Sequence, residues 1–215
     1  MKRPIFLLAA LPDVVPHVLS GLLFATGIVA MTTPSTAQQT SQAYKFLGAV
    51  EKEDGQVVTD MLDTPGSNVV NAKQVTSGKG ALHILITHPG SMFFQYLLQK
   101  GADPNLRDDK GATPLTLATM AGREDLVRLL LTYKANPNLG NAGGQTPLIL
   151  AVTNRDIALS RLLLSNGADP DQTDNLAGMS ARQYAKRDAR NPALAQLLAD
   201  APKAARRAAV AGPRF

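Results

Sequence analysis

Apolar residues in the middle of the chain fall into short blocks with helical spacing. Leu126, Val127, Leu130 and Leu131 follow one another at steps of one and three residues, so a helix there places them in one stripe. A smaller apolar block, residues 115–121, precedes them. The pattern predicts two short helices joined by a turn. Such a pair buries its apolar faces only when neighbouring pairs stack on it.

The residues that flank these blocks are typical of helix ends. Thr113 suits the N-cap position and Pro114 the first helical position. Gly122 tolerates the left-handed conformation in which many helices end. Glu124 and Asp125 then open the second helix, where negative charge is favoured by the helix dipole. These signals predict one helix–turn–helix unit.

The same landmarks return at a step of 33 residues, which is typical of a stacked array of one small unit. The recurring landmarks are Gly101, Lys134 and Gly167; Thr113-Pro114-Leu115 and Thr146-Pro147-Leu148; and Leu129-Leu130-Leu131 and Leu162-Leu163-Leu164.

Two units, with the motifs Gly111-x-Thr113-Pro114-Leu115-x-x-Ala118 and Gly144-x-Thr146-Pro147-Leu148-x-x-Ala151, resemble the ankyrin repeat. The resemblance implies an all-α solenoid of stacked helix–turn–helix units joined by short hairpin loops. It also implies a protein-binding surface rather than an active site. Small exported bacterial ankyrin-repeat proteins are the most similar group.

The repeat region is expected to run from residue 42 to residue 199. The copy that begins at Gly78 lacks Thr-Pro, and the outermost copies are more degenerate, as terminal repeats that face water often are. The predicted units are an N-terminal cap (42–73), three repeats (74–106, 107–139 and 140–173) and a C-terminal cap (174–199).

The first 37 residues have the features of a secretory signal peptide. Lys2 and Arg3 precede the apolar run Leu19–Met31, and the small residues Ser35 and Ala37 suit a cut after Ala37. We therefore expect residues 1–37 to be removed and the rest to be periplasmic or secreted.

An uncleaved membrane anchor is the alternative. A spanning helix needs about 20 consecutive apolar residues. Leu19–Met31 is shorter, and an upstream extension includes His17, Pro16 and Asp13. We favour cleavage. Contact with a membrane, as an inner-membrane-anchored scaffold, is expected only if the segment is retained.

Composition narrows the class of partner. The chain has no cysteine, so disulfides and thiol chemistry are excluded. The formal net charge is +5, but the excess cations gather in residues 200–215, which we expect to be a disordered basic tail. The nearly neutral repeats offer no basic stripe, so no nucleic-acid partner is expected. We expect a monomer that binds an unidentified protein.

The chain lacks the motifs of common catalytic sites. Neither Gly-x-Ser-x-Gly nor Gly-x-x-x-x-Gly-Lys-Ser/Thr occurs. His83 and His88 are five residues apart, which is not the i,i+4 spacing that two metal ligands on one helix prefer. In the ankyrin resemblance, His83 is structural and bonds the loops of adjacent repeats. We expect no catalysis, no cofactor and no metal site.

Partner contacts are expected where the repeat pattern does not dictate the residue. The resemblance places such contacts on the turn tips and on the first helix of each unit. Apolar residues there are the most informative, because they have no capping role. The candidates are Arg107, Asp108, Lys110, Met120, Leu139, Asn141, Asn154, Gln172, Asp174 and Leu176.

Overall fold

A computed structural model of the protein describes residues 36–88 and 92–202. The predicted signal peptide, 1–37, lies outside this part except for Thr36 and Ala37. The predicted basic tail, 200–215, lies outside it except for residues 200–202.

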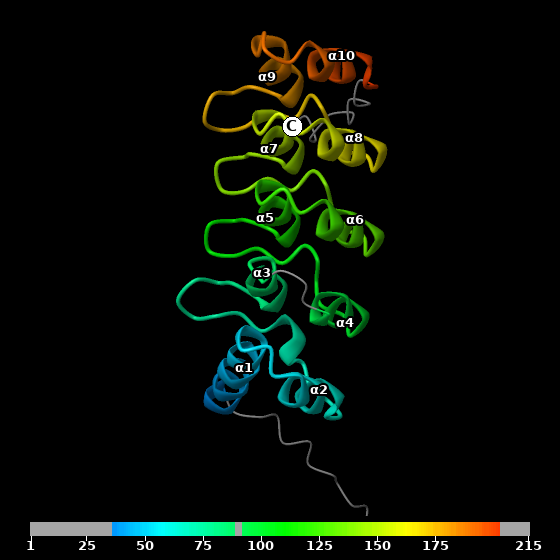
Figure 1. The fold of residues 1–215 in the computed structure, drawn as a ribbon. Helices are drawn as coiled ribbons and strands as arrows, with labels where there is room; N and C mark the ends of the chain where they lie inside the picture. The colour runs from blue at the N-terminus through cyan, green and yellow to red at the C-terminus, as the bar shows by residue number, and fades with distance from the viewer. Residues whose placement is uncertain (1–35, 89–91, 203–215) are drawn as a thin grey trace, which may run out of the picture. The chain divides into compact units, whose positions relative to one another are not determined.

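The described residues form five consecutive helix pairs and one 3₁₀ turn, η1 (Val69–Asn71), so the all-α prediction is confirmed. In Figure 1 the first helices of the pairs stack in one column and the second helices in another, with the connecting loops projecting beside the first column. The pairs are α1 (Thr36–Glu51) with α2 (Gly55–Asp63), α3 (Ala81–Leu85) with α4 (Phe93–Gln99), α5 (Pro114–Met120) with α6 (Glu124–Thr132), α7 (Pro147–Thr153) with α8 (Ile157–Ser165), and α9 (Ala181–Arg187) with α10 (Pro192–Asp200).

The helix starts and turns follow the local signals in the sequence. Thr113 is the N-cap of α5, and its hydroxyl accepts a hydrogen bond from the backbone N–H of Thr116 at 3.2 Å. Thr146 caps α7 in the same way. Gly122 has a φ of +67°, as the left-handed turn requires.

Arg155 occupies the position of Gly122 in the next unit and adopts the same left-handed conformation, with a φ of +59°. This conformation is unfavourable for a residue with a Cβ. The Arg155 guanidinium pairs with Asp188 of the following unit at 2.6 Å, which ties the strained turn to its neighbour.

One apolar core runs from α1 to α10 between the two columns of helices. Phe46, Leu130, Leu148 and Leu194 each have no exposed surface. Ser160 is also fully buried, and its hydroxyl donates to the carbonyl of Asp156 at 2.6 Å. The hydrogen bond satisfies the polar group that replaces an apolar residue in this stripe.

Asparagine side chains connect successive units across three boundaries. Asn71, Asn105 and Asn138 lie at nearly the repeat spacing, and each amide makes two hydrogen bonds to the backbone of the next unit. The Oδ1 atoms accept from the N–H groups of Asp103, Asn136 and Asp169, each at 2.7 Å. The Nδ2 groups donate to the carbonyls of Gly101, Lys134 and Gly167 at 3.2, 3.3 and 3.0 Å. We call this the asparagine ladder.

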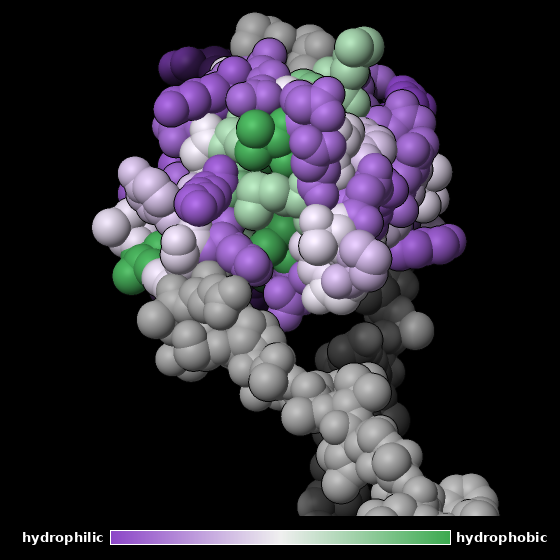
Figure 2. Space-filling view, turned by 90° about the horizontal axis from the view of Figure 1, so that it is seen from below, coloured by the Kyte–Doolittle hydropathy of each residue, from purple (hydrophilic) through white to green (hydrophobic). Residues whose placement is uncertain are grey.

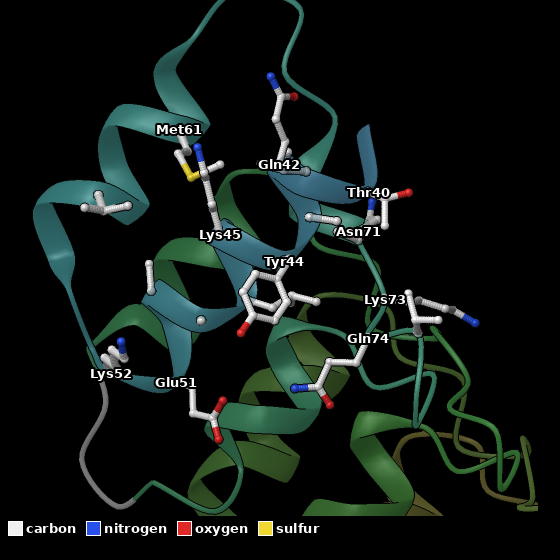
Figure 3. A pocket seen from close by; sticks show the side chains of 18 of the residues that line it. Thr40, Gln42, Tyr44, Lys45, Glu51, Lys52, Met61, Asn71, Lys73 and Gln74 are labelled. Atoms are coloured by element: carbon white, nitrogen blue, oxygen red, sulfur yellow. The ribbon is translucent and has the colours of Figure 1, made fainter. Parts of the chain in front are cut away.

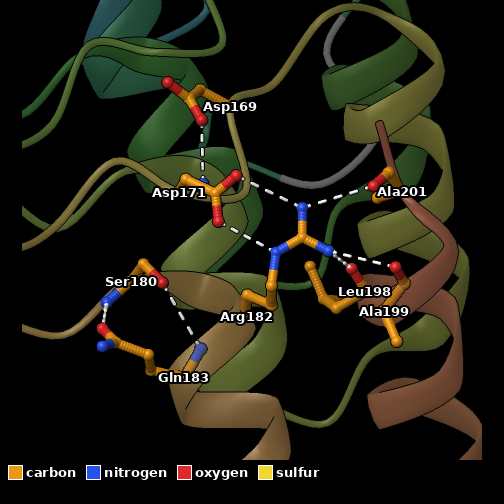
Figure 4. A network of polar contacts seen from close by, with 8 residues as sticks. All are labelled: Asp169, Asp171, Ser180, Arg182, Gln183, Leu198, Ala199 and Ala201. Carbon is orange, nitrogen blue, oxygen red and sulfur yellow. Dashed lines mark hydrogen bonds and ion pairs between the residues drawn. The ribbon is translucent and has the colours of Figure 1, made fainter. Parts of the chain in front are cut away.

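The last unit replaces the ladder asparagine with Asp171, whose carboxylate binds Arg182 (Figure 4). The Arg182 guanidinium contacts Asp171 Oδ1 at 2.9 Å and Oδ2 at 3.3 Å. It also donates to backbone carbonyls at the end of α10, those of Leu198, Ala199 and Ala201. Carbonyls in the last turn of a helix have no intrahelical partner. Arg182 therefore seals the C-terminal end of the stack.

Candidate functional site

Four loop tips project beside the first helices, and each is closed by a backbone hydrogen bond between its ends. They are tip 1 (74–79), tip 2 (108–112), tip 3 (141–145) and tip 4 (174–179). Neighbouring tips are also bonded: Asp109 donates to Ser77, Ala142 to Lys110, and Asn175 to Gly143, at 3.1, 3.0 and 2.8 Å. The tips form one continuous ridge.

Glycine permits this close approach of one tip to the next. A Cβ on Gly111 would lie 2.9 Å from the backbone nitrogen of Ala142, and one on Gly144 would lie 2.8 Å from that of Asn175. Both glycines also have a positive φ. Their one-period spacing thus reflects the spacing of the tips.

Three candidate contact residues support the tips from inside. Asp108 and Asp174 are buried, with 9% and 3% of their surface exposed. The Asp108 carboxylate accepts from the N–H groups of Lys110 and Ala112. The Asn141 Oδ1 atom accepts from Gly143 and Gln145 in the same way. We therefore exclude the buried Asp108 and Asp174 from the candidate surface, whereas Asn141 is half-buried and stays partly accessible.

The Asp174 carboxylate also accepts a hydrogen bond from the Tyr184 hydroxyl at 2.6 Å. This bond, followed by backbone N–H groups of the turn, lowers the pKa of Asp174 below its usual value. It raises the pKa of Tyr184. The pair joins tip 4 to α9, and it is a structural contact.

Arg107 and Gln172 join neighbouring units with their side chains. Arg107 donates to the carbonyl of Gly140 at 2.7 Å, and Gln172 donates to that of Asn138 at 3.1 Å. Lys110 is exposed on tip 2, and Leu139 is half-buried ahead of tip 3. Arg107 and Gln172 therefore offer a partner only part of their hydrogen-bonding capacity.

Met120, Asn154 and Leu176 are exposed candidates, as are Arg107 and Lys110. Met120 at the end of α5 is 58% exposed, and Leu176 on tip 4 is 71% exposed. Asn154 is exposed at the end of α7. Leu176 leans over tip 3, since a Cβ on Gly143 would lie 3.4 Å from its side chain. Met120 and Leu176 lie two units apart and do not form one patch.

His83 makes one inter-unit bond of the kind that the ankyrin resemblance implied. It is 1% exposed, its Nδ1 accepts from Gly80 N–H at 3.3 Å, and its Nε2 lies 3.1 Å from the Ala112 carbonyl of the next unit. Since Nδ1 accepts, Nε2 carries the proton and donates. Burial lowers the pKa of His83, and the Ala112 carbonyl opposes that shift.

The N-terminal end of the stack has a second exposed apolar surface, which the sequence interpretation missed. Seen from that end, an apolar strip runs between hydrophilic residues (Figure 2). A shallow open cavity of about 1260 Å³ follows α1, α2 and tip 1 (Figure 3). Its lining includes Tyr44, Val57 and Val75, which are 82%, 38% and 85% exposed. In the sequence, Tyr44 lies outside the apolar stripe that Phe46, Leu47 and Val50 form, and this position is the signal that points to the face.

The described part of the chain holds no group of three or more histidine, cysteine or acidic side chains arranged for a metal ion. None of the helices described in residues 36–88 and 92–202 has the length and apolar character needed to cross a bilayer.

Comparison with known proteins agrees with this architecture. A family described as ankyrin repeats (3 copies) matches residues 48–140 and 82–174, which together make up more than half of the chain. Over 77 residues the chain is 42% identical to the 2-5A-dependent ribonuclease of Homo sapiens, covering 36% of this chain and 10% of that protein. The chain thus spans about a tenth of the length of that relative, so the similarity concerns the repeats alone. The chain belongs to the ankyrin-repeat family.

Proposed function

We propose that this chain is an exported bacterial ankyrin-repeat protein that binds a protein partner in the periplasm and catalyses no reaction. Ankyrin repeats indicate a protein–protein interaction module. The partner, the compartment and the contact residues are proposals, because a fold does not by itself specify them.

The observation that carries the proposed surface is the exposure of Leu176 on the otherwise bonded ridge and of Met120 at the end of α5. Most polar candidates on the tips are used in turns or between units. Met120 and Leu176 have no such role, so their exposed apolar side chains are available to a partner. Lys110 on tip 2 and Asn154 at the end of α7 add exposed polar groups.

Site-specific photo-cross-linking in living cells tests this surface. A photoreactive residue at position 120 or 176 is expected to give a covalent adduct with the same partner protein. Position 92 is the matched control, because Met92 is 87% exposed but lies beside α4 in the second column. Adducts from position 92 alone, or none from 120 and 176, would contradict the proposed surface.

Support for export comes from the first 37 residues, which combine a basic start, an apolar run and a small-residue cleavage site. The mass of the purified chain tests this step. We expect Gln38 to be the first residue and the protein to be released with the periplasmic fraction.

The alternative is an inner-membrane-anchored ankyrin scaffold whose repeats face the periplasm. It is favoured by the apolar run Leu19–Met31, which an anchor would retain. A chain that begins at Met1 and stays in the membrane fraction would support the anchor and refute cleavage.

A further inference from the structure

The N-terminal face of the stack has the features of an interface between helices. We define this face by α1, α2 and tip 1. Tyr44, Lys45 and Glu51 of α1 are exposed on it, on either side of Gly48. Lys52, the first residue after α1, is also exposed, and its N–H continues the helical turn by donating to the Gly48 carbonyl at 3.2 Å. A Cβ on Gly48 would meet nothing within 4 Å. A helical glycine lets a second backbone approach closely.

Helix geometry separates the four side chains into two pairs. With about 100° per residue, Lys45 and Lys52 lie on one side of Gly48 and Tyr44 and Glu51 on the other. In Figure 3 Lys45 lies beside Met61 of α2, and Lys52 lies on the same side at the other end of α1, whereas Tyr44 and Glu51 lie on the side of Gln74 of tip 1. One flank of α1 is therefore cationic, and the other is aromatic and acidic.

These flanks complement one another when two copies of the face meet with a two-fold axis along α1. The rotation places the lysine flank of one copy over the Tyr44 and Glu51 flank of the other. Lys52 then faces Glu51 of the second copy, and Lys45 faces the ring of Tyr44, a cation–π pair. An axis across α1 instead sets lysine against lysine, which is repulsive.

The apolar residues follow the same symmetry. Val57 and Met61 belong to α2, and Val75 belongs to tip 1. An axis along α1 brings Val57 and Met61 of one copy toward Val75 of the other. Met92 is 87% exposed, but it lies outside the face and makes no contact in this dimer.

The two helices of the face alone provide just under half of the area that a stable interface buries. Residues 38–51 of α1 extend about 21 Å and the 9 residues of α2 about 14 Å, and each helix is about 10 Å wide, which gives a planar footprint of about 350 Å² without tip 1. The accessible area of an uneven face exceeds its planar footprint. Stable complexes bury about 800 Å² per partner.

We propose that two copies of this chain form a symmetric dimer through their N-terminal faces, with α1 parallel to α1 of the second copy, in contact at Gly48, and the two-fold axis along α1. The dimer replaces the monomer expected from the sequence. It leaves Met120 and Leu176 of both copies available, and it therefore presents two equal surfaces to a partner.

Light scattering during size-exclusion chromatography, over a range of chain concentrations, tests the dimer. The processed chain is expected to have twice the mass of one copy at high concentration. Gly48→Gln is expected to weaken association at least about tenfold, because its side chain fills the space that the second helix enters. The same substitution removes a glycine from a helix interior, so the diluted monomer is expected to unfold at the same or a higher temperature.

Charge reversal tests the orientation of the axis. Lys52→Glu and Glu51→Lys are each expected to weaken the homodimer several-fold. An equal mixture of the two variants is expected to restore association, because both contacts then pair opposite charges. Lys186→Glu on α9, an exposed residue at the other end of the stack, is the matched control and is expected to leave the mass unchanged.

Three results would overturn the proposal. They are a parent chain with the mass of one copy at every concentration, a dimer that persists in Gly48→Gln, and a homodimer that Lys52→Glu strengthens.

Discussion

At the C-terminal end of the stack, α9 and α10 expose Gln183, Lys186 and Gln196, whereas at the N-terminal end α1, α2 and tip 1 expose Tyr44, Val57 and Val75. The two ends face the same problem, since a repeat at either end lacks one neighbour. At the C-terminal end, Arg182 binds Asp171 and the last carbonyls of α10, so the chain completes its own contacts. At the N-terminal end, apolar and charged side chains stay exposed and are available to another surface. The difference shows that the repeat pattern specifies the interior of a stack and leaves its ends free to differ.

The largest expected effect tests whether the open end shares the common core. Phe46→Ala in α1 is expected to lower the free energy of unfolding by about 3–5 kcal/mol, because Phe46 is fully buried. Leu130→Ala in α6 is the interior reference, with an expected loss of about 2–5 kcal/mol. Urea unfolding measures both. A loss below about 1 kcal/mol for Phe46→Ala, beside a normal loss for Leu130→Ala, would mean that the first pair is only loosely attached.

The next effect tests the seal at the other end. Arg182→Met is expected to cost about 1.5–3 kcal/mol, because hydrogen bonds from a charged group to Asp171 and to the α10 carbonyls are lost. Amide hydrogen exchange is expected to rise in α10 and to stay unchanged in α1 and α2. The control is Arg161→Met on α8, an exposed arginine. An equal effect of both substitutions would contradict a sealing role for Arg182.

A smaller effect tests the asparagine ladder between the ends. Asn138→Ala is expected to cost about 1–2 kcal/mol, because it removes two hydrogen bonds between units. Asn138→Asp keeps the acceptor for Asp169 N–H and loses the donor to Gly167, so its loss is expected to be smaller. Chemical denaturation of the two variants and the parent measures this order. An Asn138→Asp chain less stable than Asn138→Ala would contradict the assignment.

The smallest effect is on the pH dependence of stability, which His83 and Asp174 change in different pH ranges, one in each half of the stack. His83 titrates near 6.5 when unfolded and at a lower pH when folded, so the unfolded chain binds more protons below about 6.5 and His83 lowers stability as the pH falls. The lowered pKa of Asp174 affects stability in a different, more acidic pH range. Its contribution is complete above the unfolded value near 3.8 and is lost as the pH falls through the lower folded value.

The free energy of unfolding measured between about pH 7.5 and about pH 5.5 checks this separation. The parent is expected to lose more stability over this range than His83→Gln, because glutamine does not titrate. Tyr184→Phe, which removes the donor to Asp174, is expected to keep the pH dependence of the parent in this range. Equal pH dependence of the parent and His83→Gln would contradict the role of the buried histidine.

The elements predictable from the sequence are those with local causes. Thr113 and Thr146 begin helices because a side chain caps N–H groups three residues ahead. Gly122 ends a helix because its own backbone adopts a positive φ. Each cause lies within a few residues of its effect, so a single sequence is enough to find it.

The structural contacts that escaped prediction depend on backbone groups in another unit. Asn105 and Asn138 recur visibly in the sequence, but their partners are N–H and C=O groups about one repeat away. Arg182 reaches carbonyls 16 to 19 residues away. The direction of the Asp108 carboxylate depends on the fold of tip 2, so its burial could not be predicted from the sequence either.

The apolar N-terminal face was hidden for a different reason. Exposure of Tyr44 and Val75 depends on what stacks against α1 and tip 1, and the sequence of one chain does not name that neighbour.

The difference between the two ends is tested most directly by amide hydrogen exchange of the processed chain at low and at high concentration. The account predicts that raising the concentration slows exchange in α1, α2 and residues 72–76 and leaves α9 and α10 unchanged. Exchange at the N-terminal face that does not depend on concentration, or protection that appears at α9 and α10 instead, would contradict it.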